Sequence, residues 1–478
     1  MLSFSTISDY HKALLQQQFS CEDAVQHYIG ETEKNKHLNA FVEVYAEEAL
    51  QQAKILDEKR KNGEPLKKLH GVVIAIKDVI CYKGHKVTAA SKILNGFTSV
   101  YNATAIQRLL DEDAIIIGNC NCDEFAMGSS NENSYYGNVL NAADNRKVPG
   151  GSSGGSAVAV QAGMCMASLG SDTGGSVRQP ADFCGVVGFK PGYGRISRYG
   201  LIAYASSFDQ IGIFANNIED TALLLQIMSG KDEMDSTCIQ KEAFTLPKDN
   251  KNGKKYSIAY FKEALYHSSL DKEIQKNILQ LLNELKEDGH IVKELDFSLL
   301  EYIVPAYYVL TTAEASSNLS RYDGVRYGYR TAQPVKDLTD FYKHTRTEGF
   351  GKEVQRRIML GTFVLSTGYY DAYFTKAQQV RKLLIDEMDK VFADCDTLIM
   401  PVSPTTAFTI GEKTDDPVAM YLADIYTVLA NLTGVPAIAL PLFKHSNTLP
   451  FGVQLMTKKQ DELTLLQLSS LLMKHKKN

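Results

Sequence analysis

The hydrophobic pattern along this chain alternates between helical periodicity and short, continuously apolar runs. Apolar residues recur at helical spacing across residues 6–36, where Ser20 fits the N-cap of a second helix, and again across Ala46–Lys61. The continuous run at 72–76 is typical of a strand that is buried on both faces. Helices that alternate with buried strands predict an α/β fold built in layers.

The same alternation continues to the C-terminus. Helices are expected at 104–113, 271–288 and 461–474, and a mostly helical stretch at 350–392 is expected to break near Gly361 and Gly368. Further strands are expected at 114–118, 256–261, 291–297, 396–400, 436–440 and 451–456.

Composition is typical of a globular protein, since 44% of the 478 residues are hydrophobic and 22% are charged. The formal net charge of -5 makes strong direct binding of RNA unexpected, because phosphate contacts need a basic surface. Residues 1–15 lack a basic segment followed by an apolar one, and no apolar run approaches the roughly 20 residues that span a bilayer. We therefore expect a cytoplasmic protein that makes no membrane contact.

Eight cysteines lie among apolar residues, which favours free buried thiols in a reducing compartment. Cys120 and Cys122 form a C-x-C pair that no C-x-x-C pair accompanies. No metal site is predicted, and a zinc site at these two cysteines is the alternative.

Residues 150–200 hold 13 of the 34 glycines, together with two clusters of serines. A flexible linker is one interpretation, but apolar runs at 157–163 and 185–189 interrupt the glycines. A phosphate loop is a second, but the G-x-x-x-x-G-K-[ST] spacing is absent. We favour a loop that carries a serine nucleophile and turns backbone amides toward an oxyanion.

A serine hydroxyl needs a base, and none of the ten histidines lies within residues 150–200. A lysine serves instead if burial lowers its pKa toward roughly 7–8. Lys77 follows the apolar run at 72–76, which is a suitable setting. The alternative is an exposed Lys77–Asp78 pair at the end of a strand.

Three segments make the chain resemble the amidase signature family. They read GVVIAIKD at 71–78, GGSSGGS at 150–156 and GSDTGGSVRQP at 170–180. The resemblance implies one large domain over residues 1–478, with a mixed central sheet covered by helices and a signature core at about 66–215. It also implies amide hydrolysis by a Ser-Ser-Lys triad.

By this resemblance Ser176 is the nucleophile, and Ser152 relays a proton between Ser176 and the base, Lys77. The Gly151–Ser152 peptide bond would be cis. The oxyanion hole would consist of the backbone amides of Thr173, Gly174 and Gly175.

The polar side chains around these residues are expected to hold the loop rather than to react. Asp172 and Arg178 would stabilise it as charged hydrogen-bonding groups. Hydrogen bonds to nearby backbone are expected for Ser153, Ser156, Ser168 and Ser171.

Within the family, the resemblance covers nearly the whole chain and is closest to the A subunits of aspartyl/glutamyl-tRNA amidotransferases. Segments at 123–132, 314–319, 322–328 and 348–354 carry it. It implies a heterotrimer with subunits B and C, in which this chain hydrolyses glutamine and a partner activates the mischarged tRNA with ATP and magnesium. This chain itself would hold no cofactor. Whether Glu-tRNA(Gln), Asp-tRNA(Asn) or both are amidated stays open.

Free glutamine needs a cation for its carboxylate and an anion for its ammonium group. The resemblance assigns these roles to Arg356 and Asp424, with the adjacent Arg357 as a rival for Arg356. A charge on a helix surface stays the alternative for either arginine. The resemblance adds to the substrate pocket Tyr307, Gly128 and Ser129.

Two other functions are weighed against this one. A stand-alone amidase would act on another small amide, but the opposite charges of Arg356 and Asp424 argue against acyl-chain or aryl amides. A scaffold protein without activity is the other, but Lys77, Ser152 and Ser176 are all intact.

Overall fold

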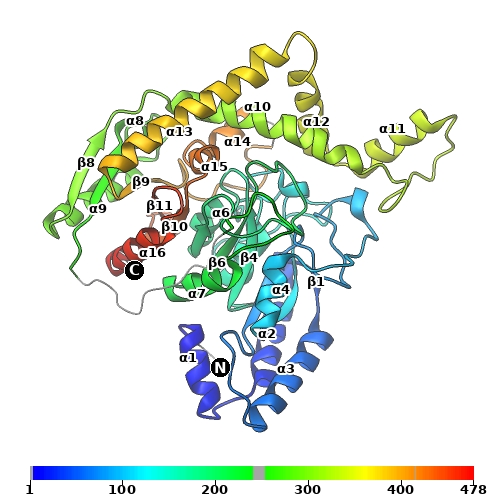
Figure 1. The fold of residues 1–478 in the computed structure, drawn as a ribbon, viewed down its shortest axis with the longest axis vertical. Coiled ribbons are helices and arrows are strands. Elements are labelled where there is room, and N and C mark those ends of the chain that lie inside the picture. Colours follow the sequence, from blue (N-terminus) through cyan, green and yellow to red (C-terminus); the bar gives the residue numbers. More distant parts are fainter. Residues whose placement is uncertain (1–3, 241–252, 415, 478) are drawn as a thin grey trace.

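The structure, a computed structural model, describes residues 4–240, 253–414 and 416–477 and is organised on one sheet of 11 strands (Figure 1). The strands are β1 (Phe41–Val44), β2 (Val73–Lys77), β3 (Ile115–Cys120), β4 (Ala167–Asp172), β5 (Val187–Lys190), β6 (Gln210–Ala215), β7 (Ser257–Phe261), β8 (Ile291–Leu295), β9 (Thr397–Pro401), β10 (Ala437–Lys444) and β11 (Pro450–Met456). Their order is β1-β3-β2-β4-β6-β5-β10-β11-β9-β7-β8. Some neighbouring strands are parallel, such as β2 and β3, and others are antiparallel, such as β4 and β6. The expected mixed central sheet is confirmed.

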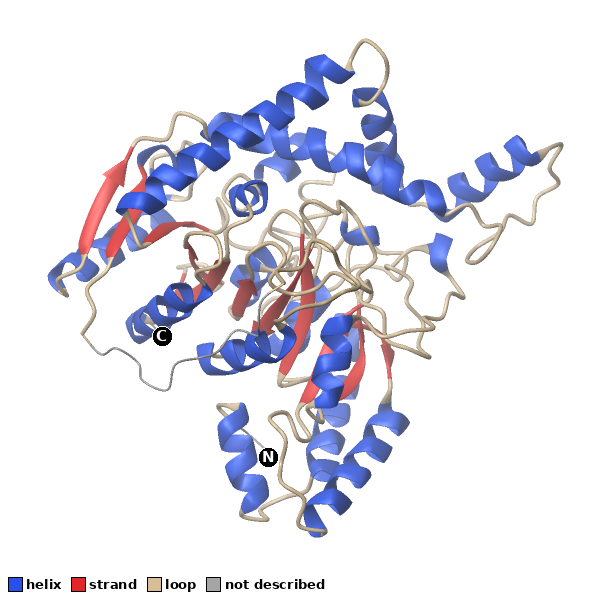
Figure 2. Ribbon diagram, viewed as in Figure 1, coloured by secondary structure: helices blue, strands red, loops and turns tan. Residues whose placement is uncertain are grey.

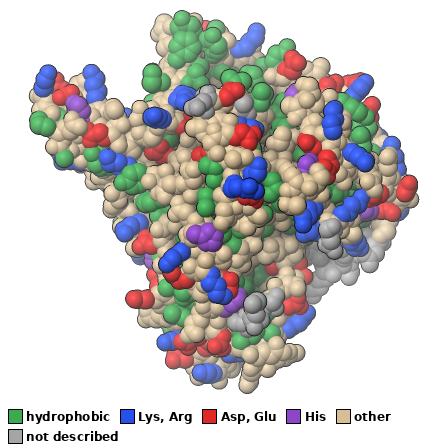
Figure 3. Space-filling view, turned by 180° about the vertical axis from the view of Figure 1, so that it is seen from behind, with side chains coloured by type: hydrophobic (Ala, Val, Ile, Leu, Met, Phe, Trp, Pro, Cys, Tyr) green, Lys and Arg blue, Asp and Glu red, His purple; other side chains and the backbone are tan. Residues whose placement is uncertain are grey.

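Helices surround this sheet (Figure 2). In Figure 1, α1 to α3 lie at the bottom, α10, α12 and α13 form a layer across the top, and α11 projects to the right. The helices are α1 (Ile7–Leu15), α2 (Cys21–Lys34), α3 (Ala46–Lys61), α4 (Thr104–Asp111), α5 (Gly154–Gln161), α6 (Arg178–Cys184), α7 (Ile218–Met228), α8 (Lys262–Leu265), α9 (Lys272–Glu287), α10 (Leu300–Asn318), α11 (Leu338–Gly349), α12 (Lys352–Val364), α13 (Lys376–Asp394), α14 (Pro417–Leu422), α15 (Val428–Thr433) and α16 (Glu462–Leu472). Seen from behind, hydrophobic side chains gather at the top of the molecule, over the joint between α12 and α13 (Figure 3).

The strand order brings the predicted lysine and serines to one edge of the sheet. β2 and β4 are parallel neighbours, with Ile76 opposite Leu169, so their carboxyl ends meet at the same edge. Lys77 is the last residue of β2, and the turn at 173–176 directly follows β4. Carboxyl ends of parallel strands are where sites form in open α/β sheets, and the sequence motifs converge there.

Most predicted elements occur within a few residues of their expected positions, and Ser20 caps α2 through a capping box with Asp23. α10 has no predicted counterpart, because Pro305 inside it reads as a helix breaker in the sequence. The expected break at Gly361 is wrong. Gly361 lies within α12, where a side chain would overlap the Thr312 carbonyl, so the glycine allows close packing of α12 on α10. The break at Gly368 is confirmed, with a φ of 89°.

All eight cysteines are buried, and none forms a disulfide within the described chain, as expected for free thiols. Among the described residues, no three His, Cys, Asp or Glu side chains gather as a metal ion would require. None of the helices in the described ranges is long and apolar enough to cross a membrane.

Candidate active site

The Lys77 side chain is fully buried at the end of β2 and contacts three serine hydroxyls. Its Nζ lies 2.7 Å from Ser152 Oγ and 2.9 Å from the Oγ atoms of both Ser153 and Ser171. Burial lowers the pKa of Lys77 to about 8, because the protein interior solvates an ammonium group less well than water does. Part of the Lys77 population is therefore neutral near pH 7, and a neutral amine can accept a proton.

Asp78 is also fully buried, but its carboxylate faces a different set of donors. It accepts hydrogen bonds from the backbone amides of Thr88 (3.1 Å) and Ala90 (3.0 Å). The alternative of an exposed Lys77–Asp78 pair is wrong, because neither side chain reaches the surface.

The hydroxyl groups around Lys77 differ in the acceptors to which they can donate a hydrogen bond. Ser153 Oγ donates to the backbone carbonyl of Ser171 (3.1 Å), so it accepts from Lys77 Nζ. Among the described residues, the side chain of Ser152 bonds only to Lys77, so its hydrogen can point at the lone pair of a neutral amine. This arrangement suits the transfer of a proton from Ser152 to Lys77.

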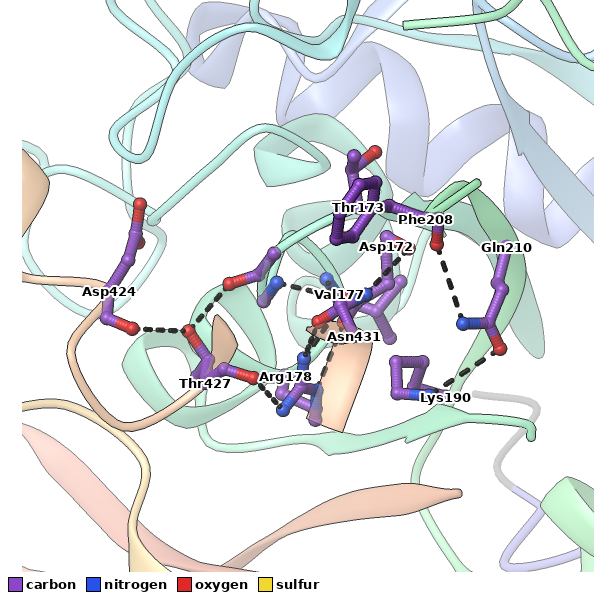
Figure 4. A network of polar contacts seen from close by, with 12 residues as sticks. Asp172, Thr173, Val177, Arg178, Lys190, Phe208, Gln210, Asp424, Thr427 and Asn431 are labelled. Atoms are coloured by element: carbon purple, nitrogen blue, oxygen red, sulfur yellow. Dashed lines mark hydrogen bonds and ion pairs between the residues drawn. The ribbon is translucent and has the colours of Figure 1, made fainter. Parts of the chain in front are cut away.

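A second buried lysine, Lys190, shows what this chemistry requires (Figure 4). Burial, together with the charge of Arg178, lowers the pKa of Lys190 to about 7. Its Nζ, however, donates to the carbonyl oxygens of Pro191 (2.8 Å) and Val435 (2.6 Å), which can only accept. Lys190 thus connects the ends of two strands, and of these two buried lysines only Lys77 has hydroxyl partners that can return a proton.

Ser176 ends the turn at 173–176, and 8% of its surface is exposed. The Gly151–Ser152 peptide bond is cis, as the resemblance implies, and the Ser153 amide donates to the Ser176 carbonyl (3.3 Å). The turn requires glycines, because a side chain at Gly174 would overlap the Tyr307 ring and one at Gly175 would overlap Thr427. The two serine segments are therefore in direct contact, and the turn packs closely against Tyr307 and Thr427.

A buried ion pair between Asp172 and Arg178 holds this turn (Figure 4). Arg178 Nε and Nη2 donate to the Asp172 carboxylate at 3.1 and 3.0 Å. Burial alone would raise the pKa of Asp172, but Arg178 outweighs it and the pKa falls to about 2, so the carboxylate is ionised. The predicted role of both residues in stabilising the loop is confirmed.

The Asp172 carboxylate also accepts a hydrogen bond from one of the backbone amides that were expected to form the oxyanion hole. The Gly175 N–H donates to Asp172 Oδ1 (2.8 Å), and the Val177 N–H donates to Oδ2 (3.2 Å). Of the three predicted amides, that of Gly175 thus already has an anionic acceptor.

The loop serines behave in two ways. Ser156 Oγ donates to the Leu169 carbonyl (3.0 Å), as expected for local backbone bonding. Ser153 bonds to the backbone as expected and also to Lys77. Ser171 differs from expectation, since its hydroxyl contacts Lys77, and Ser168 Oγ lies 3.9 Å from Cys120 Sγ.

Sequence reasoning missed the residues of the C-terminal third that complete the ion-pair network. Arg178 donates to the Thr427 carbonyl (2.8 Å), to Gln454 Oε1 (2.9 Å) and to Asn431 Oδ1 (2.7 Å). Thr427 Oγ1 in turn donates to the Gly174 carbonyl (2.7 Å). One signal in the sequence could have indicated them. Asn431 and Gln454 each lie inside an apolar run, and a polar group that is buried there needs a hydrogen-bonding partner.

Asp424, which is predicted to bind the ammonium group of the substrate, is a buried carboxylate. Ser129 Oγ (2.8 Å) and the Tyr308 hydroxyl (2.9 Å) donate to its Oδ2. Burial raises the pKa of Asp424 to about 6 in spite of these two bonds. Of the predicted pocket residues, Ser129 and Asp424 are thus in contact, and Tyr307 packs against Gly174.

The two candidate arginines differ in exposure. The Arg356 side chain is 50% exposed and pairs with Glu353, whereas Arg357 is buried among the rings of Tyr204, Tyr308 and Tyr421. Arg357 Nε donates to Glu353 (2.8 Å) and Nη1 to the Tyr204 hydroxyl (2.9 Å).

Both arginines line a cavity of about 300 Å³, together with Gly128, Ser130, Lys413 and Tyr421. Ring stacking of Tyr308 on Tyr421, with centroids 3.9 Å apart, connects this cavity to Asp424. The lining of the cavity does not include Ser176.

Comparison with known proteins finds relatives along nearly the whole chain. Residues 23–466 match a family model described as Amidase. The chain is 48% identical to the A subunit of glutamyl-tRNA(Gln) amidotransferase from Chlorobium limicola over 459 residues, which is 95% of this chain and 96% of that protein. A crystal structure of the corresponding protein from Thermotoga maritima has a TM-score of 0.78 at 39% identity, over 95% of this chain and 91% of that one. A structure described as an amidase has a TM-score of 0.83 at 27% identity, over 98% and 100% of the two chains.

Replacing Arg178 by methionine should destabilise the fold. The variant leaves the Asp172 carboxylate buried without its cation, which costs about 3–5 kcal/mol of the free energy of unfolding. Urea unfolding at pH 7 measures this loss, and Arg146→Met, which breaks the exposed pair with Asp144, should leave the midpoint unchanged. Because the pKa of Asp172 lies below its usual 3.8, the ion pair contributes above pH 3.8 and is lost as the pH falls toward 2. Equal midpoints for the two variants would contradict this role.

Proposed function

The chain belongs to the amidase family, and we propose that it is the glutamine-hydrolysing A subunit of a tRNA-dependent amidotransferase. One contact carries the proposal of amide hydrolysis: Lys77 Nζ lies 2.7 Å from Ser152 Oγ at a buried site that lowers the pKa of the amine to about 8. The names of the relatives support a tRNA-linked acceptor. Glutamine as the nitrogen donor follows from the resemblance to the A subunits, and the opposite charges of Arg356 and Asp424 suit its carboxylate and ammonium groups.

In this proposal, Ser176 Oγ attacks the side-chain amide carbon of glutamine. Its proton passes to Ser152, and the proton of Ser152 passes to neutral Lys77. The carbonyl oxygen becomes an oxyanion that accepts from the backbone amides of Thr173 and Gly174, while the Gly175 amide holds the turn through Asp172. The proton returns through Ser152 to the nitrogen, the C–N bond breaks, and ammonia leaves. Water then attacks the ester along the same relay and releases glutamate.

The charges of free glutamine meet opposite charges at the pocket. Asp424 receives the ammonium group, and with a pKa of about 6 it is mostly ionised at pH 7. Arg356 receives the carboxylate, because its half-exposed side chain lines the cavity and can turn from Glu353 to a ligand. Arg357 lines the same cavity and is the rival for this role. Gly128, Ser129 and Tyr307 complete the pocket.

The acceptor chemistry belongs to partner chains in this proposal. Subunits B and C would form a heterotrimer with this chain in the cytoplasm, and a partner would use ATP and magnesium to activate Glu-tRNA(Gln) or Asp-tRNA(Asn). The net charge of -5 gives this chain little attraction for tRNA, and its sequence has no G-x-x-x-x-G-K-[ST] loop. A stand-alone amidase is the alternative, and the amidase with a TM-score of 0.83 is the relative that favours it.

The pH dependence of glutamine hydrolysis tests the base. We expect kcat/KM to rise through about pH 6 as Asp424 ionises and through about pH 8 as Lys77 loses its proton. Lys77→Ala should abolish hydrolysis with the fold retained, and Lys77→Arg should be equally inactive because guanidinium does not deprotonate. An active Lys77→Ala variant would rule out the Ser-Ser-Lys assignment.

Substitution of each arginine in turn identifies the carboxylate ligand. Arg356→Ala should raise KM for glutamine by about 10- to 100-fold, since a hydrogen bond to a charged group contributes about 1.5–3 kcal/mol. Acylation of Ser176 by a small uncharged reagent should be unchanged, which shows an intact nucleophile. If Arg356→Ala leaves KM unaltered and Arg357→Ala raises it, the role passes to Arg357.

Loss of the nucleophile separates an ammonia-donating subunit from a free-standing amidase. Ser176→Ala removes one oxygen at a site with 8% exposure, so assembly with B and C should persist. The mutant complex should lose glutamine-dependent amidation of Glu-tRNA or Asp-tRNA but keep amidation when ammonium salt is supplied. Failure of any reconstitution with B and C to amidate tRNA from ammonium would favour the stand-alone amidase.

A further inference from the structure

Large apolar side chains gather on the surface where α12 passes into α13. We name this set the hairpin cap, and its exposed members are Met359, Leu360, Phe363, Tyr369, Tyr370 and Tyr373. The Phe363 ring lies 4.3 Å from that of Tyr369 and 5.8 Å from that of Tyr373, centroid to centroid, so these three rings are contiguous. Met359 and Leu360 precede Phe363 by four and three residues on α12, which places them on the same side of the helix. Figure 3 shows the corresponding hydrophobic surface at the top of the molecule. A contiguous patch of this kind on a soluble protein commonly marks an interaction site.

Charges are scarce in the hairpin cap, where the exposed Asp371 is the one charged residue between Met359 and Tyr373. The 13 residues at 358–370 contain no Asp, Glu, Lys, Arg or His, although 22% of the whole chain is charged and about three would be expected. Depletion of charge with enrichment of Tyr, Phe and Met is the compositional signature of the core of a protein interface. The segment 325–336, which precedes α11, differs from the hairpin cap. Its exposed apolar residues Val325, Tyr327 and Val335 are interspersed with charged ones, Arg326, Arg330 and Lys336.

The hairpin cap is a preformed surface. Gly361 lets α12 approach the Thr312 carbonyl of α10, and the hydroxyls of Ser316 and Thr362 lie 3.0 Å apart across the two helices. A surface already held in place loses little conformational entropy on binding, which favours affinity.

α12 also connects the hairpin cap to the candidate substrate pocket. Phe363 follows Arg357 by six residues, a rise of about 9 Å along a helix. A protein seated on the cap therefore contacts the same helix that presents Arg356 and Arg357 to the cavity.

We propose that the hairpin cap is the docking surface for a partner protein of the complex that presents an apolar, charge-poor face. The inference rests on the proposed function, which requires a second protein close to the glutamine pocket to receive ammonia. A different polypeptide fits better than a second copy of this chain, because the relatives are named as the A subunit of an amidotransferase.

Charged substitutions at exposed positions of the cap test this docking. Met359→Asp and Tyr369→Asp, alone and combined, place a carboxylate on side chains that are 73% and 45% exposed, so the fold should tolerate them. Leu15→Asp is the matched control, since Leu15 is 65% exposed at the end of α1, at the opposite end of the molecule (Figure 1). Each full-length variant is titrated with purified B and C subunits, and complex formation is followed by sedimentation velocity.

We expect each single substitution to weaken the complex at least about tenfold and the double substitution about 100-fold, as for interface hot spots. Leu15→Asp should bind as the wild type does, and thermal melting should be alike for all variants. Wild-type affinity of the double variant would overturn the docking assignment while the proposed function stands. A wild-type chain that forms no complex with B and C would overturn both. A chain that dimerises alone, and is made monomeric by the cap substitutions, would identify a self-interface and also overturn the assignment.

Discussion

Burial of the Lys77 amine is the constraint on which the rest of the site depends. A charged amine inside the sheet is unfavourable, and the pKa of about 8 expresses that cost. The three serine hydroxyls that compensate come from two separate segments, 152–153 and 171, so both must meet β2 at the carboxyl edge of the sheet. The parallel pairing of β2 with β4 supplies that position. The glycine-rich sequence at 150–156 follows from the same requirement, since side chains at Gly151, Gly154 and Gly155 would overlap neighbouring atoms.

Burial alone does not make a lysine a base in this protein. Lys77 and Lys190 are both fully buried, and desolvation lowers the pKa of each. The difference lies in their partners, because hydroxyl groups both donate and accept whereas carbonyl groups only accept. A buried lysine therefore identifies a candidate base only together with the hydrogen-bonding capacity of its neighbours.

The local setting of the chemical groups was predictable from the sequence, whereas their roles in a triad came from the resemblance to the amidase signature family. Lys77 follows an apolar run and the serines lie in glycine clusters, so strand, turn and residue types could be inferred without a structure. The partners of Arg178 could not, because Thr427, Asn431 and Gln454 are distant in the chain and nothing in periodicity brings them to α6. α10 was not predicted because its local sequence is misleading. Pro305 indicates a helix break, but packing of α10 against α12 and α13 stabilises the helix in spite of it.

In the proposed function, the two halves of the chain contribute different parts of the site and meet at the turn 173–176. Lys77, Ser152 and Ser176 come from the first half, whereas Tyr307, Arg356 and Asp424 come from the second. Tyr307 packs on Gly174, and Thr427 bonds to the carbonyl of that same glycine. In the proposed function, substrate recognition would thus rest directly on the backbone that stabilises the oxyanion. In the proposed function, side chains on α12 act at the cavity, and the lining of that cavity does not include Ser176. Thr427 and Asn431 act on the turn that carries Ser176, since Thr427 bonds to the Gly174 carbonyl and Asn431 bonds to Asp172.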